Sequence, residues 1–113
     1  MKYIRTKDGI YEIVGFDDEC IIPSPIIKMN GKLTHCSDYK NCKQADTIEE
    51  LCDEFVLVEK IREVTYHHKS STFADFKSIA MLNERYTLYG AIWASKGLIF
   101  VAKMNEKGDL ELI

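Results

Sequence analysis

Histidines and cysteines supply the side chains of this 113-residue chain that could bind a metal ion or attack a substrate. His35 and Cys36 are neighbours, Cys42 follows in the next segment, and His67 and His68 form a second pair. Imidazole nitrogens and thiolates are common zinc ligands, but structural zinc sites favour close pairs such as C-x2-C, and this sequence has none. Two metal hypotheses remain, one built on the first three residues and one on the histidine pair.

The sequence lacks the motifs that are typical of nucleophilic catalysis and of phosphate binding. A nucleophile needs a base that a third group orients, and the adjacency of His35 and Cys36 does not provide this geometry. No G-x-S-x-G elbow is present, and the glycines are scattered singly, so no phosphate-binding loop can be assembled. His67 and His68 would point to opposite faces of a strand and could share a task only in a loop. We therefore predict no catalytic residue, no cofactor and no metal.

The cysteines and the opening residues both predict a cytoplasmic protein. The four cysteines are spaced C-x15-C-x5-C-x9-C and are expected to be thiols in a reducing compartment. Cys20 and Cys52 are predicted to be small core residues, and Cys36 and Cys42 are predicted in or near a loop. The opening run "MKYIRTKDG" places charged residues and a glycine where a signal peptide needs apolar residues.

Charge and hydropathy argue against nucleic acid and membrane as partners. Eighteen acidic and fifteen basic residues give a net charge of −3. No run of Lys or Arg is dense enough to follow a phosphate backbone. The longest uncharged stretch lies between Arg85 and Lys96 and is far shorter than the ~20 apolar residues of a membrane span. We expect neither general nucleic-acid binding nor a membrane segment.

One predicted helix carries an acidic face. Residues 46–55 start with Asp46, which can accept a hydrogen bond from an orphan amide, and Glu49 can reach back to it in a capping box. Apolar residues follow at helical spacing, and the opposite face holds Glu49, Glu50, Asp53 and Glu54. These four acids, with His67 and His68, are the candidate partner-binding residues. The acids could also imitate nucleic-acid charge and inhibit a host enzyme, or form the solvated side of the helix.

The remaining chain is predicted to be rich in strands. Residues 2–6 and 10–16 flank an Asp-Gly turn and predict a hairpin. A second helix is predicted over 72–84, capped by Ser71 or Thr72. The runs "TLYGAIWAS", "GLIFVAKM" and "DLELI" predict a closing three-stranded meander.

The first two strands of this meander are apolar on both faces, which is typical of strands that are covered on both sides. Tyr89 and Trp93 are therefore predicted to lie in the core. Together the elements predict an α+β fold: a single globular domain over residues 1–113, with a mainly antiparallel sheet of five to seven strands, the C-terminal meander and about two helices.

Three stretches of the chain carry a resemblance. The runs "KQADTIEELCDEFVLV" (43–58) and "YGAIWASKGLIFVAKMNEKGDLELI" (89–113), with the opening "MKYIRTKDGIYEI", resemble small uncharacterised proteins encoded by phages and prophages of Gram-positive bacteria. The three stretches cover about half of the chain and contain no catalytic motif. The resemblance implies a bacterial or viral cytoplasm and an accessory role on a mobile element, but it supplies no site residues.

The function that we expect from these observations is non-catalytic. The chain would bind another protein through its irregular segments, 17–42 and 61–72, or through the acidic face, and an exposed edge strand could support a homo-oligomer. The alternatives are a metal-binding protein or small enzyme that uses the histidines and cysteines, and an acidic mimic of nucleic acid.

Overall fold

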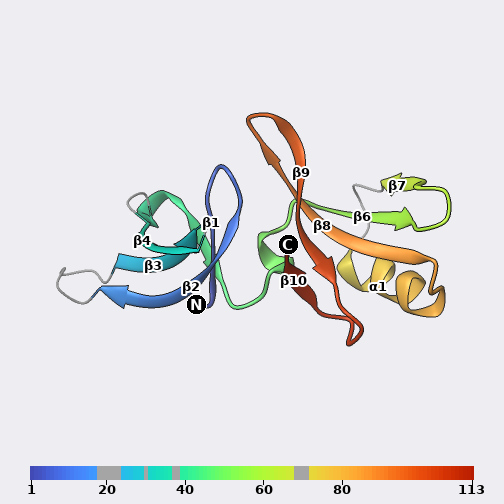
Figure 1. The fold of residues 1–113 in the computed structure, drawn as a ribbon, viewed down its shortest axis with the longest axis horizontal. Helices are drawn as coiled ribbons and strands as arrows, with labels where there is room; N and C mark the ends of the chain where they lie inside the picture. The colour runs from blue at the N-terminus through green and yellow to red at the C-terminus, as the bar shows by residue number, and fades with distance from the viewer. Residues whose placement is uncertain (18–23, 30, 37–38, 68–71) are drawn as a thin grey trace. The chain divides into compact units, whose positions relative to one another are not determined.

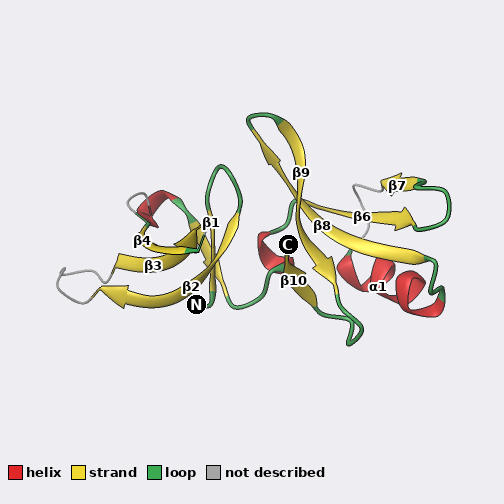
Figure 2. Ribbon diagram, in the orientation of Figure 1, coloured by secondary structure: helices red, strands yellow, loops and turns green. Residues whose placement is uncertain are grey.

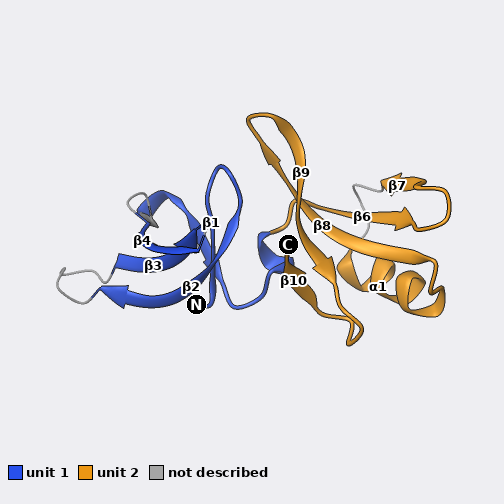
Figure 3. Cartoon of the chain, in the orientation of Figure 1, with its two compact units in different colours: residues 1–51 blue, residues 52–113 orange. Residues whose placement is uncertain are grey.

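The computed structural model describes residues 1–17, 24–29, 31–36, 39–67 and 72–113. In this part of the chain, strands β1 to β10 alternate with one α-helix and two short 3-10 helices (Figures 1 and 2). The chain divides into two compact units, Met1–Leu51 and Cys52–Ile113 (Figure 3). The strand pairs of the described residues are antiparallel, which agrees with the predicted α+β class. The single domain over residues 1–113 stays a prediction.

Unit 1 is built on a five-stranded sheet in the order β4-β3-β2-β1-β5. Its elements are β1 (Tyr3–Arg5), β2 (Ile10–Asp17), β3 (Ser24–Met29), β4 (Lys32–His35), η1 (Tyr39–Asn41), β5 (Lys43–Ala45) and η2 (Glu49–Leu51). The predicted hairpin is present as β1 and β2, and the Thr6 N–H donates to the Gly9 carbonyl at 2.8 Å to close it. Ile4 and Ile27 lie at the centre of the core, where Cys36 packs against them.

The predicted helix over residues 46–55 is wrong. Only Glu49–Leu51 is helical, as the 3-10 turn η2, and strand β6 begins at Glu54. The apolar, β-branched run "FVLV" favours a strand over the end of a helix. It is paired along its whole length with β8. This pairing extends back to Asp53, whose N–H donates to the Ala91 carbonyl at 2.9 Å. The 46–55 segment therefore has room for one turn.

Unit 2 combines a second five-stranded sheet, in the order β10-β9-β8-β6-β7, with the helix α1. Its elements are β6 (Glu54–Glu59), β7 (Thr65–His67), α1 (Phe73–Leu82), β8 (Tyr86–Ala94), β9 (Gly97–Met104) and β10 (Leu110–Leu112). The helix predicted over 72–84 is confirmed, with Thr72 as its N-cap. Phe76 and Ala80 of α1 pack against Leu57 and Leu88, which form the core on this face of the sheet.

The three strands of the predicted meander, β8, β9 and β10, lie at one end of the unit 2 sheet. β8, β9 and β10 pair one after another, but they do not stand alone, since β6 and β7 extend the sheet on the other side of β8. Only one of the two predicted helices is present among the described residues, and it packs on one face. The core positions predicted for Tyr89 and Trp93 are wrong for this reason: Trp93 is 51% exposed and Tyr89 is half-buried.

Candidate functional site

An exposed aromatic face lies on unit 2, opposite the side that α1 covers. It consists of Tyr89 and Trp93 on β8 and Phe100 on β9, and we call these three residues the aromatic face. Successive residues of a strand point to opposite sides, so Tyr89 and Trp93 face away from Leu88, which packs against α1. Trp93 is 51% exposed and Phe100 is 44% exposed. This surface is therefore open to a partner.

A β-bulge brings Phe100 to the aromatic face. Tyr89 is opposite Lys103 and Gly90 is opposite Ala102, but Ala91 is opposite Phe100 because the register shifts between Gly90 and Ala91. In an unbroken register Phe100 would have turned to the other side of the sheet. As a result, the rings of Tyr89 and Phe100 stack, with their centroids 5.1 Å apart and their planes at 19°.

Two carboxylates from the start of β6 hold Trp93. The backbone N–H of Trp93 donates to Asp53 Oδ2 at 2.9 Å, and its indole Nε1–H donates to Glu54 Oε1 at 3.0 Å. The Glu54 side chain is buried, whereas half of Trp93 is exposed. The indole is thus fixed at its polar edge and presents its apolar surface to solvent, an arrangement that suits binding.

His67 contacts the other oxygen of the same carboxylate. β7 pairs with β6 so that His67 is opposite Val56, which places His67 on the same side of the sheet as Glu54. His67 Nε2 contacts Glu54 Oε2, and this oxygen is buried without a hydrogen bond from any other described residue. Glu54 therefore joins the edge strand β7 to Trp93 of the aromatic face.

The candidate partner-binding residues that the structure describes lie in two different units. Glu49 and Glu50 belong to η2 in unit 1, and Glu50 accepts a hydrogen bond from Thr47 Oγ1 at 3.1 Å. Asp53 and Glu54 belong to unit 2, so the four acids share no helix face. His67 joins Asp53 and Glu54 around Trp93, and His68 lies outside the described residues.

Sequence reasoning missed the exposure of Trp93 and Phe100. Alternating positions of β8 carry Tyr89, Ala91 and Trp93, and this pattern suits a covered and an uncovered face equally well. The exposure of Trp93 and Phe100 arises because α1, the one α-helix among the described residues, packs on the opposite side of the sheet, and the position of Phe100 depends on the bulge. Neither the open side of the sheet nor the bulge can be recognised from the amino-acid sequence alone.

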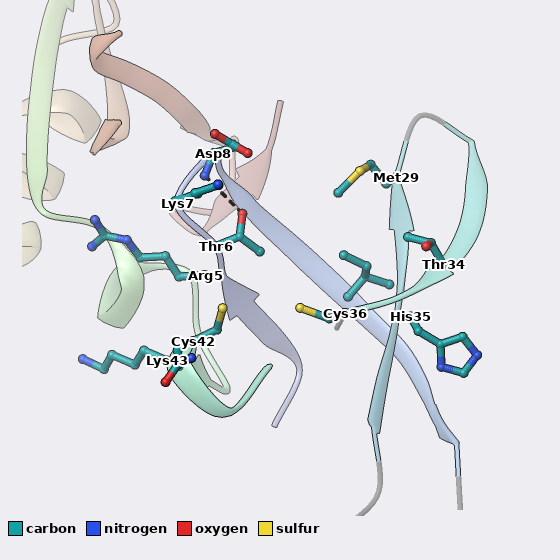
Figure 4. Close-up of a pocket in the computed structure, with 12 residues that line it drawn as sticks. Arg5, Thr6, Lys7, Asp8, Met29, Thr34, His35, Cys36, Cys42 and Lys43 are labelled. Atoms are coloured by element: carbon teal, nitrogen blue, oxygen red, sulfur yellow. Dashed lines mark hydrogen bonds between the residues drawn. The ribbon is translucent and has the colours of Figure 1, made fainter. Parts of the chain in front are cut away.

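The first metal hypothesis leads to a cavity in unit 1. Cys36 and Cys42 line a cavity of about 580 Å³, together with Met29, Thr6 and Thr34. Figure 4 shows both thiols directed into the cavity, whereas the His35 ring points away from them. His35 Nε2 lies 3.7 Å from Asp17 Oδ2.

His35 and Cys36 diverge because they are successive residues of an extended segment. In the described part of the chain, no group of three or more His, Cys, Asp or Glu side chains is placed to hold a metal ion. The histidine and the two thiols therefore do not form the arrangement that a tetrahedral zinc site requires.

Two of the basic residues that line this cavity, Arg5 and Lys43, have structural contacts. Arg5 and Lys43 are opposite each other on β1 and β5. Arg5 Nη1 donates to the Leu51 carbonyl at 3.3 Å, and Lys43 Nζ donates to the Glu50 carbonyl at 3.2 Å. Both side chains therefore attach the η2 turn to the sheet of unit 1.

Comparisons with protein-family models, with curated proteins and with solved structures find no match to this chain. No helix in the described residues has the length and apolar character that crossing a membrane requires.

Proposed function

We propose that this chain is a non-catalytic binding protein that recognises another protein through the aromatic face of unit 2. The observation that carries the proposal is the fixed and half-exposed indole of Trp93. Trp and Tyr are enriched among the residues that dominate binding energy at protein interfaces. A side chain held in place before binding loses less conformational entropy when the complex forms.

The charges around the aromatic face favour a basic partner. Asp53 and Glu54 lie beside Trp93, and Lys103, opposite Tyr89, has Glu111 on its other side. The whole chain has a net charge of −3. Aromatic rings attract Arg and Lys side chains through their π faces. The partner that fits is a protein surface on which Arg or Lys side chains stand among apolar residues.

The biological setting of the proposal comes from the resemblance to phage and prophage proteins. In that setting the chain acts as an accessory protein in the cytoplasm of a Gram-positive bacterium and binds a host or phage protein. The acidic-mimic alternative receives less support, because it needed four carboxylates along one helix face and residues 49–54 form a 3-10 turn and the start of a strand.

Affinity capture with matched variants tests this function. The intact chain, Phe100→Ala and Leu82→Ala are immobilised and exposed to cytosol from a Gram-positive host. Leu82 is an exposed apolar residue on α1 and serves as the control. We expect a partner that the wild-type chain and Leu82→Ala retain and that Phe100→Ala binds at least about tenfold more weakly, as hot-spot truncations cost roughly 2 kcal/mol or more.

The emission of Trp93 then checks direct contact, because it is the single tryptophan of the chain. Addition of the purified partner should change this emission. Equal retention by all three proteins, or an unchanged emission at saturation, would show that the aromatic face is not the binding surface.

A further inference from the structure

Unit 1 brings two thiols to the wall of one cavity. Cys36 follows β4, Cys42 precedes β5, and the turn η1 lies between them. The Cys36 N–H donates to the Pro25 carbonyl at 3.0 Å, which fixes Cys36 to β3. Cys42 is fixed by its neighbour Lys43, which pairs with β1. Both cysteines are thus attached to the sheet, and they pack into the same apolar cluster.

Three sulfur atoms lie among the donor atoms of this cavity, beside the oxygen and nitrogen donors of Thr6, Asp8, Thr34, His35 and Asn41. Its walls carry the thiols of Cys36 and Cys42 and the thioether of Met29, and Asp8 is the carboxylate among the described lining residues. Thiolate and thioether sulfur select soft ions such as Cu(I), whereas Mg²⁺ and Ca²⁺ require several oxygen ligands. Cu(I) also accepts a coordination number of two or three, so it does not need the histidine that points away.

An anionic ligand fits the cavity less well. The basic groups of Arg5 and Lys43 donate to the carbonyls of η2, and Figure 4 shows both side chains extending away from Met29 and Thr34. Arg5 and Lys43 therefore do not converge on a position inside the cavity, and Lys7 is the remaining lysine of its lining.

We propose that Cys36 and Cys42 bind one Cu(I) ion in the cavity of unit 1. Each thiol releases its proton to solvent when its sulfur binds the ion, and no oxidation or reduction takes place. The site does not depend on the proposed protein-binding function, because all of its residues belong to unit 1 and the aromatic face belongs to unit 2.

A pair of double variants isolates the two thiols. Cys20→Ser with Cys52→Ser leaves Cys36 and Cys42 as the only thiols of the chain, and Cys36→Ser with Cys42→Ser removes both. Each reduced protein is titrated anaerobically with Cu(I) in competition with bicinchoninate. Binding is read from the chelator absorbance and from the near-ultraviolet thiolate-to-copper charge-transfer band.

We expect the first variant and the wild-type chain to take up one Cu(I) with similar affinity. Since loss of an outer-shell partner already costs about 10–100-fold in metal affinity, loss of both ligands should cost more than about 100-fold. Retention of Cu(I) by the second variant, or no uptake by the first, would overturn the site.

Cys36 is buried, so its replacement could disturb folding. The single variant Cys42→Ser avoids this difficulty, because Cys42 is only partly buried. Circular dichroism confirms that this variant is folded before titration. A folded Cys42→Ser protein that binds Cu(I) as tightly as the wild-type chain would also contradict the proposal.

Discussion

At the scale of single residues, the Glu54 carboxylate connects three strands of unit 2. It belongs to β6, accepts the indole N–H of Trp93 from β8 and contacts His67 on β7. A buried carboxylate is costly unless its oxygens have partners, and the Trp93 indole supplies one for Oε1 while His67 contacts Oε2. The position of Trp93 in the aromatic face therefore depends on a residue that solvent barely reaches.

Replacement of Glu54 by Ala should destabilise unit 2 and release the indole. The variant leaves the indole N–H of Trp93 and the His67 ring without their partner, and we expect a loss of about 1–3 kcal/mol in the free energy of unfolding. Urea denaturation measures this loss, and the anisotropy of Trp93 emission should fall. Glu54→Gln keeps an acceptor oxygen for the indole and should lose less. Equal stability of Glu54→Ala and the wild-type chain would show that the carboxylate does not hold Trp93.

At the scale of elements, α1 begins with the N-cap that its sequence predicts. The Thr72 Oγ1 accepts from the Asp75 N–H at 3.4 Å, and the Asp75 carboxylate accepts from the Thr72 N–H at 3.1 Å. This reciprocal capping box uses residues three positions apart, so local sequence was enough to predict it. The acids of the 46–55 segment have the same spacing, but strand pairing with β8 prevails there.

Replacement of Thr72 by Ala should weaken the helix start. Loss of an N-cap side chain costs about 0.5–2 kcal/mol, and urea denaturation should show a lower midpoint with an unchanged slope. Ser78→Ala on the same helix is the control. Its hydroxyl donates to the Ala74 carbonyl at 3.1 Å, and alanine is the better helix former, so stability should not fall. A larger loss in Ser78→Ala than in Thr72→Ala would contradict the importance of the cap.

At the scale of the whole molecule, each unit has its own hydrophobic cluster. Ile4, Ile27 and Cys36 form the cluster of unit 1, and Leu57, Phe76, Ala80 and Leu88 form that of unit 2. The sequence predicts one domain over residues 1–113, and cooperative unfolding is the property that defines one. The position of Trp93 in unit 2 makes this property measurable, because its emission reports on the unit that contains it.

Replacement of Ile4 by Ala tests the single domain. Ile4 is fully buried in unit 1, and truncation to Ala should cost about 2–5 kcal/mol. If the chain is one cooperative domain, the thermal transition detected by Trp93 emission should move down together with the transition detected by far-ultraviolet circular dichroism. A shift in circular dichroism with an unchanged Trp93 transition would show that the units unfold separately.

The amino-acid order by itself determined the features that depend on neighbouring residues. The hairpin of β1 and β2 follows from its Asp-Gly turn, α1 follows from its capping box, and β8 and β9 follow from their apolar runs. Tertiary structure alone decided the features that depend on distant residues. Strand pairing moved residues 54 and 55, the end of the predicted helix, into β6, because backbone hydrogen bonds to β8 and burial of the apolar run outweigh helix propensity.

The candidate binding face belongs to this second group. The exposure of Trp93 depends on which side of the sheet α1 covers, and the position of Phe100 depends on one extra residue in β9. Both are consequences of packing and register between segments far apart in the chain. The local pattern of apolar residues is identical whether the face is covered or open, so only the folded structure distinguishes the two.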